Sequence, residues 1–366
     1  MPRSFSHRVI TRVALGATMA TFIAIAFAGP LDPPAGPIES TNKPLAEIEP
    51  RTALSSTNTP SNGQSRFVIS TSGSYYLVAG SPAPLIINHI EIGPSATNVT
   101  IDLMGHMLTV SSFRAAITAP AAPAARTLVI RNGTIRGSGP SNGILVDSDA
   151  TVIIEDVRFE SLSRVIDVAG AATVRRCDVR DCNLSGLPGV SSSAAIDVGA
   201  NSIVENCRVD TAIGSGSNPC VRVGNNSVVR DCVLTQTNTG EFGIDAGSTC
   251  IIENNVIRND GDAATFTAVQ IGAAGIVRDN VFSTLAAGTH IGVAGTSITT
   301  VVDNVFSGYD TAVSLGGASD CLVVRNHFRG ASTAIDATFP GSNIFGPLVT
   351  AGGVAASNNP HANYSN

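Results

Sequence analysis

Apolar residues return along this chain in short alternating runs, and the runs repeat about every twenty-five residues. Residues 250–259, 274–283 and 299–308 read CIIENNVIRN, AGIVRDNVFS and TTVVDNVFSG, each with Asn before Val. Alternation with a period of two predicts strands that bury one face, and no segment has a convincing 3.6-residue helical period. A repeat of this length built from strands and turns predicts a parallel β-helix, in which each copy lies directly on the last.

Ten copies of the phrase can be aligned on its last apolar residue. A second alternating run accompanies most copies, as in AIDVG (195–199) and GIDAG (243–247). We therefore expect an all-β parallel β-helix solenoid of about ten to eleven coils over residues 98–345. The anchors of the copies are Met107, Ile135, Phe159, Val179, Val209, Leu234, Ile257, Phe282, Phe306 and Phe328.

Two columns of this alignment predict contacts from coil to coil. Two residues before the anchor, a column of thiols gives way to a column of Asn, whose amides can bond between stacked strands. Four residues before the anchor the charge alternates, which supports the register by about 0.2–1 kcal/mol per pair. We interpret both columns as structural, with a charged binding strip as the alternative for the second. The first column is Cys177, Cys207, Cys232, Asn255, Asn280, Asn304 and Asn326, and the second is Arg131, Glu155, Arg175, Glu205, Arg230, Glu253 and Arg278.

The two ends of the chain do not carry the repeat. Residues 1–28 combine a basic start, an apolar run and an Ala-Phe-Ala cleavage site, which predicts a secretory signal peptide. Residues 29–66 are rich in Pro, Ser and Thr and predict an extended leader. Residues 67–97 are expected to form an N-terminal cap and the first strands, and residues 346–366 a C-terminal tail or cap.

Charge and composition narrow the partners. The formal net charge is −6 and becomes about −9 without residues 1–28, which hold three Arg and no acid. A nucleic-acid partner is not expected, because phosphate binding needs a basic face. No later segment is long and apolar enough to span a membrane, so we expect a protein that is secreted, periplasmic or on the cell surface. The chain has no Trp, which removes the best platform for stacking sugars.

The segments GSYYLVAG (73–80), NVTIDLMGHML (98–108) and LVIRNGTIRGSG (128–139), with the coils that follow, resemble secreted right-handed β-helix proteins of the pectin-lyase-like superfamily. The resemblance extends from about Glu49 to the C-terminus and is greatest to uncharacterised bacterial members. It implies the fold and a capped first coil. It implies little about activity, because members include lyases, hydrolases and adhesins.

Working groups in enzymes of this superfamily project outward from the second run, and that position defines our candidate site. Asp167, Asp197 and Asp245 are the candidate catalytic residues, with Arg222 between the last two. Adjacent coils lie roughly 4.8 Å apart, which predicts about 5 Å between Asp167 and Asp197 and about 10 Å between Asp197 and Asp245, close to the separations in glycosidase pairs. Arg222, Gln270 and Tyr309 are the candidate substrate-binding residues. The whole outward position is predicted as Leu145, Asp167, Asp197, Arg222, Asp245, Gln270, Gly292, Ser314 and Asp336.

Other chemistry finds little support in the sequence. Motifs resembling those of polygalacturonases are missing, and no Lys lies in the coils to serve as a lyase base. Asp260 and Asp262 form one weak candidate for a cation, and a solvated turn is the simpler interpretation. No cofactor is expected, except calcium if the protein is a lyase. The seven Cys leave at least one unpaired.

These observations favour an exported β-helix that is non-catalytic or binds polysaccharide weakly as a surface scaffold. A polysaccharide lyase or glycoside hydrolase that uses the outward Asp residues is the alternative. A purely structural surface protein or adhesin is the second alternative. The sequence does not set the oligomeric state.

Overall fold

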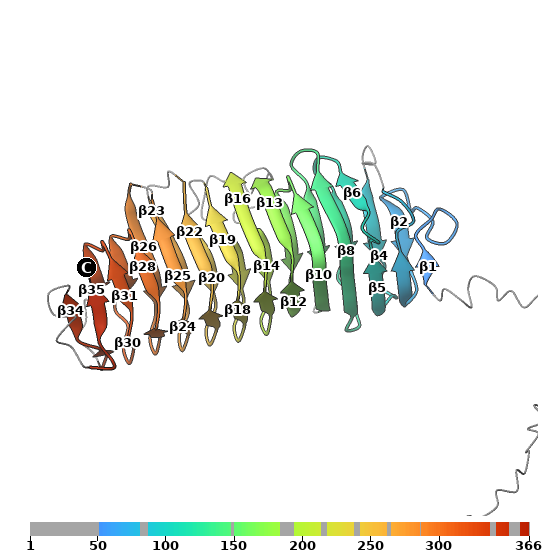
Figure 1. The fold of residues 1–366 in the computed structure, drawn as a ribbon. Helices are drawn as coiled ribbons and strands as arrows, with labels where there is room; N and C mark the ends of the chain where they lie inside the picture. The colour runs from blue at the N-terminus through green and yellow to red at the C-terminus, as the bar shows by residue number, and fades with distance from the viewer. Residues whose placement is uncertain are drawn as a thin grey trace, which may run out of the picture. The chain divides into compact units, whose positions relative to one another are not determined.

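The computed structural model describes residues 51–80, 87–147, 150–183, 194–213, 218–237, 242–261, 265–285, 287–336, 342–350 and 359–365, and the structural statements below concern these residues. The chain divides into two units, Met1–Glu49 and Pro50–Asn366. The predicted signal peptide and residues 29–50 of the predicted leader lie outside the described residues. The second unit is a stack of strands that follow one another in chain order (Figure 1). Its described residues include no helix that could span a membrane.

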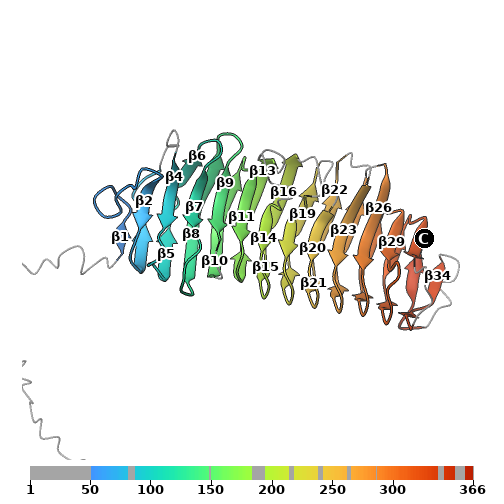
Figure 2. The ribbon, with the colours of Figure 1, turned by 180° about the vertical axis from the view of Figure 1, so that it is seen from behind.

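The strands form two sheets, and pairing between successive turns is parallel throughout. Figure 2 shows the same stack from behind. The smaller sheet takes one strand from each turn and has twelve strands. They are β2 (Ser65–Ile69), β4 (Asn88–Ile92), β7 (Ala115–Ala119), β9 (Asn142–Val146), β11 (Arg164–Val168), β14 (Ile196–Val198), β17 (Val221–Val223), β20 (Phe242–Ala246), β23 (Thr265–Ile271), β26 (Thr289–Gly295), β29 (Thr311–Ser314) and β32 (Thr333–Asp336).

The larger sheet has twenty-three strands and takes two from most turns. The predicted all-β parallel solenoid of ten to eleven coils is confirmed, with about eleven turns. The strands are β1 (Thr52–Ala53), β3 (Gly73–Tyr76), β5 (Asn98–Asp102), β6 (Met107–Val110), β8 (Thr127–Gly137), β10 (Thr151–Glu160), β12 (Ala172–Arg175), β13 (Asp178–Asn183), β15 (Ile203–Glu205), β16 (Arg208–Ile213), β18 (Val228–Arg230), β19 (Val233–Gln236), β21 (Ile251–Glu253), β22 (Val256–Asn259), β24 (Ile276–Arg278), β25 (Val281–Thr284), β27 (Thr300–Val302), β28 (Val305–Ser307), β30 (Leu322–Val324), β31 (His327–Arg329), β33 (Ile344–Phe345), β34 (Leu348–Thr350) and β35 (Asn363–Ser365).

The larger sheet bends within each turn at one residue with a left-handed backbone, which lies between two strands in seven turns and inside β8 or β10 in two. Its φ lies between 52° and 67° in nine turns, and most of these residues are Asn or Asp, which tolerate that conformation best. Arg176 and Arg325 are the exceptions. Each donates two hydrogen bonds to the Asp at the same position one turn earlier. The nine are Asn132, Asp156, Arg176, Asn206, Asp231, Asn254, Asp279, Asp303 and Arg325.

Asn side chains fasten the C-terminal turns from inside. Asn280 accepts hydrogen bonds from the backbone N and the Nδ2 of Asn255, at 2.9 and 3.0 Å, and its own Nδ2 donates to Ile252 O and Asn304 Oδ1. The same pattern continues through Asn304 and Asn326. Since these amides are buried and bonded, the ladder fixes the vertical register of the turns.

Thiols occupy this column in the earlier turns. The Sγ atoms of Cys177, Cys207 and Cys232 each donate to a carbonyl one turn before, at 3.6–3.7 Å. Asn255 Nδ2 makes the equivalent bond to Val229 O at 2.9 Å. These buried thiols pack in the core. Their hydrogen bonds to the previous turn are weaker equivalents of the bond that Asn255 Nδ2 donates.

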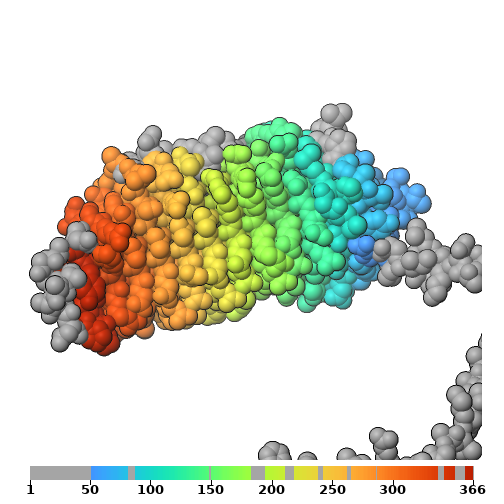
Figure 3. Space-filling view, in the orientation of Figure 1, coloured from blue at the N-terminus to red at the C-terminus, as the bar shows by residue number. Residues whose placement is uncertain are grey.

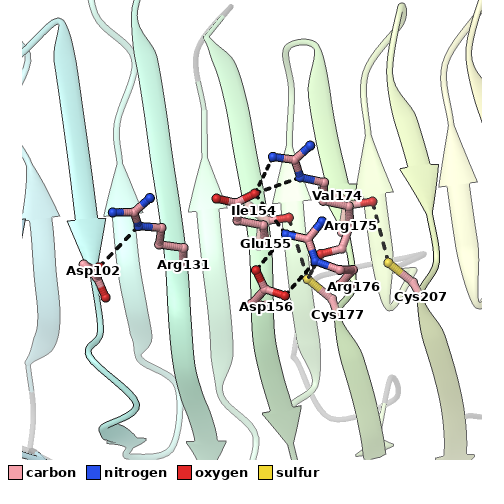
Figure 4. Close-up of polar contacts among 10 residues, drawn as sticks. All are labelled: Asp102, Arg131, Ile154, Glu155, Asp156, Val174, Arg175, Arg176, Cys177 and Cys207. Atoms are coloured by element: carbon pink, nitrogen blue, oxygen red, sulfur yellow. Dashed lines mark hydrogen bonds and ion pairs between the residues drawn. The ribbon is translucent and has the colours of Figure 1, made fainter. Parts of the chain in front are cut away.

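Ion pairs run along the outside of the larger sheet, in the column where charge alternates (Figure 4). Arg175 Nε donates to Glu155 Oε2 at 2.8 Å, and Arg230 Nε to Glu205 Oε2 at 2.9 Å. Arg278 pairs with Glu253 in the same way. Asp102 adds an earlier member, 3.3 Å from Arg131 Nε. Each of these Arg residues thus pairs with the acid one turn before it.

The ends of the stack differ from a simple reading of the repeat. Residues 51–66, predicted as leader, supply β1, which pairs with β3, and the start of β2. Leu108, not Met107, aligns with Ile135, and Met107 faces solvent. In the tail, β35 pairs with β31, and Asn363 Oδ1 accepts from Asn326 N at 2.9 Å. The tail therefore adds one more member to the Asn ladder.

Candidate functional site

The candidate site is the row of outward side chains on the 12-stranded sheet. Each lies between two buried neighbours, as Asp197 does between Ile196 and Val198, because a strand turns alternate residues to opposite faces. The pairing places Asp167 beside Asp197, Arg222 between Asp197 and Asp245, and Gln270 beside Asp245. We call Asp167, Asp197, Arg222, Asp245 and Gln270 the Asp row. The five lie on consecutive turns. Figure 3 shows the stacked turns of this unit as adjacent coloured bands.

Gly292 does not belong to the row, contrary to the sequence prediction. Gln270 aligns with Ala294, which aligns in turn with Ser314. Gly292 faces the core instead. A Cβ at this position would lie 2.4 Å from Phe306 Cδ1 and 2.5 Å from Ala312 O, so only Gly fits there.

Arg222 bridges the two carboxylates on either side of it. Its NH1 lies 3.0 Å from Asp197 Oδ2, and its Nε lies 3.2 Å from Asp245 Oδ2. All three side chains are half-buried. The guanidinium therefore neutralises part of both charges and fixes the positions of three polar groups on neighbouring turns.

Arg164 forms an ion pair with Asp167 in the same way, and the sequence analysis did not predict it. Its NH1 lies 2.8 Å from Asp167 Oδ2. Arg164 begins β11, three residues before Asp167, and both side chains are half-buried. The signal was available in the segment RVIDV (164–168), where an Arg opens the strand that carries the acid.

Burial and ion pairing act in opposite directions on the acids of the row. Burial is the larger influence and raises the pKa of Asp167, while Arg164 lowers it and Asp197 adds to the rise. Burial likewise raises the pKa of Asp197, against the pull of Arg222. Both groups thus have a pKa above the ordinary range despite their Arg partners.

The other candidate residues lie at the end of the Asp row or outside it. Gln270 is exposed and available to a ligand. Tyr309, expected to bind substrate, is wholly buried and packs edge-on against Phe306. The apolar surroundings of its ring raise the pKa of its hydroxyl, and it lies in the core, where a ligand on the outer surface does not reach it. Asp260 is exposed, and Asp262 lies outside the described residues.

A hollow of about 410 Å³ lies beside the first turns of the Asp row. It is lined by Ala121, Ala122, Pro123, Ala124, Ala125, Asp147 and Ala169. Asp147 follows Leu145, and Ala169 follows Asp167, each by two residues. Asp147 is the one ionisable group in this lining, so the hollow offers shape and apolar contact but few polar contacts. Within the described ranges, no three His, Cys, Asp or Glu side chains are grouped so as to hold a metal ion.

The comparison with protein-family models agrees with this architecture. Residues 123–289 match the family described as "Right handed beta helix region". The protein is thus a right-handed parallel β-helix, as the resemblance implied. No curated protein matches the chain.

Among solved structures, the chain is similar to the A-module of the Azotobacter vinelandii mannuronan C-5 epimerase AlgE6. The two are 12% identical, with a TM-score of 0.31, and the match covers 75% of this chain and 91% of the other. Similarity at this level says nothing about activity.

Proposed function

We propose that this protein is exported and that its Asp row binds polysaccharide without cleaving it. One observation carries the proposal: every candidate carboxylate is already held by an Arg, Asp167 by Arg164, and Asp197 and Asp245 by Arg222. A general acid must gain and lose a proton, and each neighbouring guanidinium opposes the protonation that burial of these carboxyls promotes. Fixed, half-buried polar groups on a rigid sheet suit hydrogen bonds to sugar hydroxyls instead.

The geometry of the sheet suits a polymer. Adjacent parallel strands lie about 4.8 Å apart, so the row repeats its polar groups at a spacing close to the length of one sugar. A chain laid along the solenoid would meet Asp197, Arg222 and Asp245 in succession. Weak contacts of this kind add along a polymer because the second contact is intramolecular.

Export is supported by the first residues of the chain. Arg3, Arg8 and Arg12 precede an apolar run and an Ala-Phe-Ala site, the composition of a secretory signal. Cleavage after Ala28 predicts Gly29 as the first residue of the mature protein. N-terminal sequencing of protein recovered outside the cytoplasm tests this, and a chain that still begins at Met1 would contradict it.

A second candidate function, polysaccharide cleavage by a lyase or hydrolase, has one observation in its favour. Asp167 and Asp197 lie directly beside each other on adjacent turns, and burial raises the pKa of both. A spacing of about 5 Å is that of the carboxylates in retaining glycosidases. The ion pair to Arg164 opposes this role for Asp167, because that carboxylate would have to carry a proton.

Co-sedimentation with insoluble polysaccharides, neutral and acidic, tests the binding proposal. We expect the wild type to bind at least one of them and Arg222→Gln to weaken that binding by about tenfold, or about 1.4 kcal/mol. Arg136→Gln is the matched control, because Arg136 is an ion-paired outward Arg on the other sheet. Equal binding by wild type and Arg222→Gln, or none by either, would contradict the proposal.

A further inference from the structure

The outer face of the second strand in each turn of the 23-stranded sheet changes character halfway along the solenoid. In the first half its outward residues, apart from Thr134, are charged, and each forms an ion pair with a residue two positions further along its strand. Arg158 Nε lies 2.7 Å from Glu160 Oε1, and Arg180 NH2 lies 2.7 Å from Asp178 Oδ2. From β19 onward the same position holds valine in four successive turns. In order, this outward row reads Thr134, Arg158, Asp178, Arg208, Val233, Val256, Val281, Val305 and His327.

These valines form a continuous ladder open to solvent. Val233 is 39% exposed and Val281 is 44% exposed, and Val256 and Val305 are partly exposed. We call the four the valine strip. Parallel pairing stacks them at about 4.8 Å, so the strip is one side chain wide and four turns long.

A second, polar row runs beside the valine strip on the same strands. It consists of Thr235, Arg258, Ser283 and Ser307, each two residues after a valine. Arg258 is exposed and makes no ion pair with any residue that the structure describes. Each turn of this face thus offers one apolar contact and one hydrogen-bonding group.

We propose that the valine strip and its polar row form a second binding surface, which takes one linear, uncharged polysaccharide chain laid along the solenoid axis. The C–H faces of successive sugars would rest on successive valines, and their hydroxyls would bond to Ser283, Ser307 and Arg258. This surface is on a different sheet from the Asp row, so the proposal stands or falls independently of the proposed function. With both surfaces in use, one protein bridges two glycan chains.

The dimensions and charge of the valine strip indicate which kind of ligand it binds. Four half-exposed valines in single file present far less area than the roughly 800 Å² per partner that a standard protein interface buries. A second copy of the chain is therefore a poor fit. A polyuronate carries a negative charge on every sugar, whereas this face has a single cation in four turns, and the whole chain has a net charge of −6. An uncharged polymer matches both observations.

Isothermal titration calorimetry with cellohexaose, mannohexaose and hexagalacturonate tests the proposal. We expect a neutral hexasaccharide to bind wild type and Arg222→Gln through the strip, and Val281→Asp to lose this component by tenfold or more. The sheet accepts an acid in this row, since Asp178 occupies it in an earlier turn. Ser283→Ala with Ser307→Ala removes two hydroxyls without adding charge, and we expect severalfold weaker binding.

Three results would overturn the proposal. The first is Val281→Asp and the Ser variant both binding neutral hexasaccharides as wild type does. The second is binding of hexagalacturonate alone, abolished in Arg258→Gln. The third is self-association of the wild type, seen by analytical ultracentrifugation and abolished by Val281→Asp, with no binding of oligosaccharide. If Arg222→Gln leaves all glycan binding intact while Val281→Asp removes it, the strip stands and the Asp row fails.

Discussion

Arg126 supplies the hydrogen bond that Pro120 cannot make. In this column of the 12-stranded sheet, the residue after most strands donates its amide to the preceding turn, as Gly93 does to Ile69 O and Asp147 to Ala119 O. Pro120 occupies the same position and has no N–H. Arg126 NH1 instead donates a hydrogen bond to the carbonyl oxygen of Ile92, at 3.3 Å. The Arg126 side chain is buried, and its Nε and NH2 have no partner among the described residues.

Because the Arg126 guanidinium takes the place of the amide that Pro120 lacks, mutations at these two positions should be energetically coupled. Arg126→Met leaves Ile92 O without a donor, which costs about 1–3 kcal/mol, whereas Pro120→Ala provides an amide for it. We expect Arg126→Met to lower the free energy of unfolding by about 1–2 kcal/mol less in the Pro120→Ala background than in the wild type. Urea unfolding of the four proteins measures this, and an identical effect in both backgrounds would contradict the account.

The Asn ladder should be a major source of stability. Asn280→Ala removes an acceptor for Asn255 N and donors to Ile252 O and Asn304 Oδ1, all buried. Because each buried group left unpaired costs about 1–3 kcal/mol, we expect a loss of more than about 2 kcal/mol. Asn98→Ala, at an exposed position, serves as the control in the same chemical denaturation series, with an expected change within about 0.5 kcal/mol. Similar losses in both variants would show that the ladder adds little.

Acid should destabilise the N-terminal turns through His89. Burial, the largest influence, lowers the pKa of His89 to about 4 from its ordinary 6.5, although its Nε2 lies 2.5 Å from Thr109 O. The unfolded chain therefore takes up this proton first as the pH falls. Stability should decline between pH 6.5 and pH 4 by up to about 3 kcal/mol.

Replacing His89 by Gln should flatten that part of the pH profile, because Gln offers a donor that does not titrate. His361→Gln, at an exposed position, should leave the profile as in wild type. Thermal unfolding at half-unit pH steps gives the comparison. A His89→Gln profile as steep as that of wild type would assign the acid sensitivity to other groups.

Thiol reactivity tests the packing of the core. All seven cysteines are buried in the described part of the chain, and none is in a disulfide. Burial raises the pKa of Cys182 to about 12 and also raises the pKa of Cys250, which suppresses the reactive thiolate. We expect no rapid reaction with a thiol reagent at pH 8 in the native protein and seven reactive thiols in denaturant. Fewer than seven after denaturation would reveal a disulfide, and fast native labelling would reveal an open core.

The repeat spacing predicted most of the vertical alignment, because stacked strands must place like residues over like. Val174 over Ile154 and Glu205 over Arg175 follow from counting residues back from the anchor. Counting failed in β26, where the predicted outward residue lies two positions before the one that pairs with Gln270. β26 places Ala294 rather than Gly292 in the outward row, and Gly292 packs against Phe306 in the core.

Contacts between residues far apart in the sequence could not be predicted, for a different reason. Asn363 joins the ladder of Asn326 only because the chain returns to pair β35 with β31, skipping the residues between. Tyr309 looked like a surface aromatic because the repeat does not define its position, yet it fills the core beside Phe306. Among the candidate residues, the order along the Asp row followed from spacing, whereas the ion pair of Arg164 with Asp167 was not predicted, although both residues lie on one strand.

Release of reducing ends is the measurement that most directly tests whether the Asp row binds or cleaves. Each polysaccharide that wild type retains would be incubated with wild type and with Asp197→Asn, with and without calcium. We predict no new reducing ends from either protein, together with weaker retention by Asp197→Asn. Release by wild type that disappears in Asp197→Asn would contradict the account and make the row the active site of a polysaccharide-cleaving enzyme.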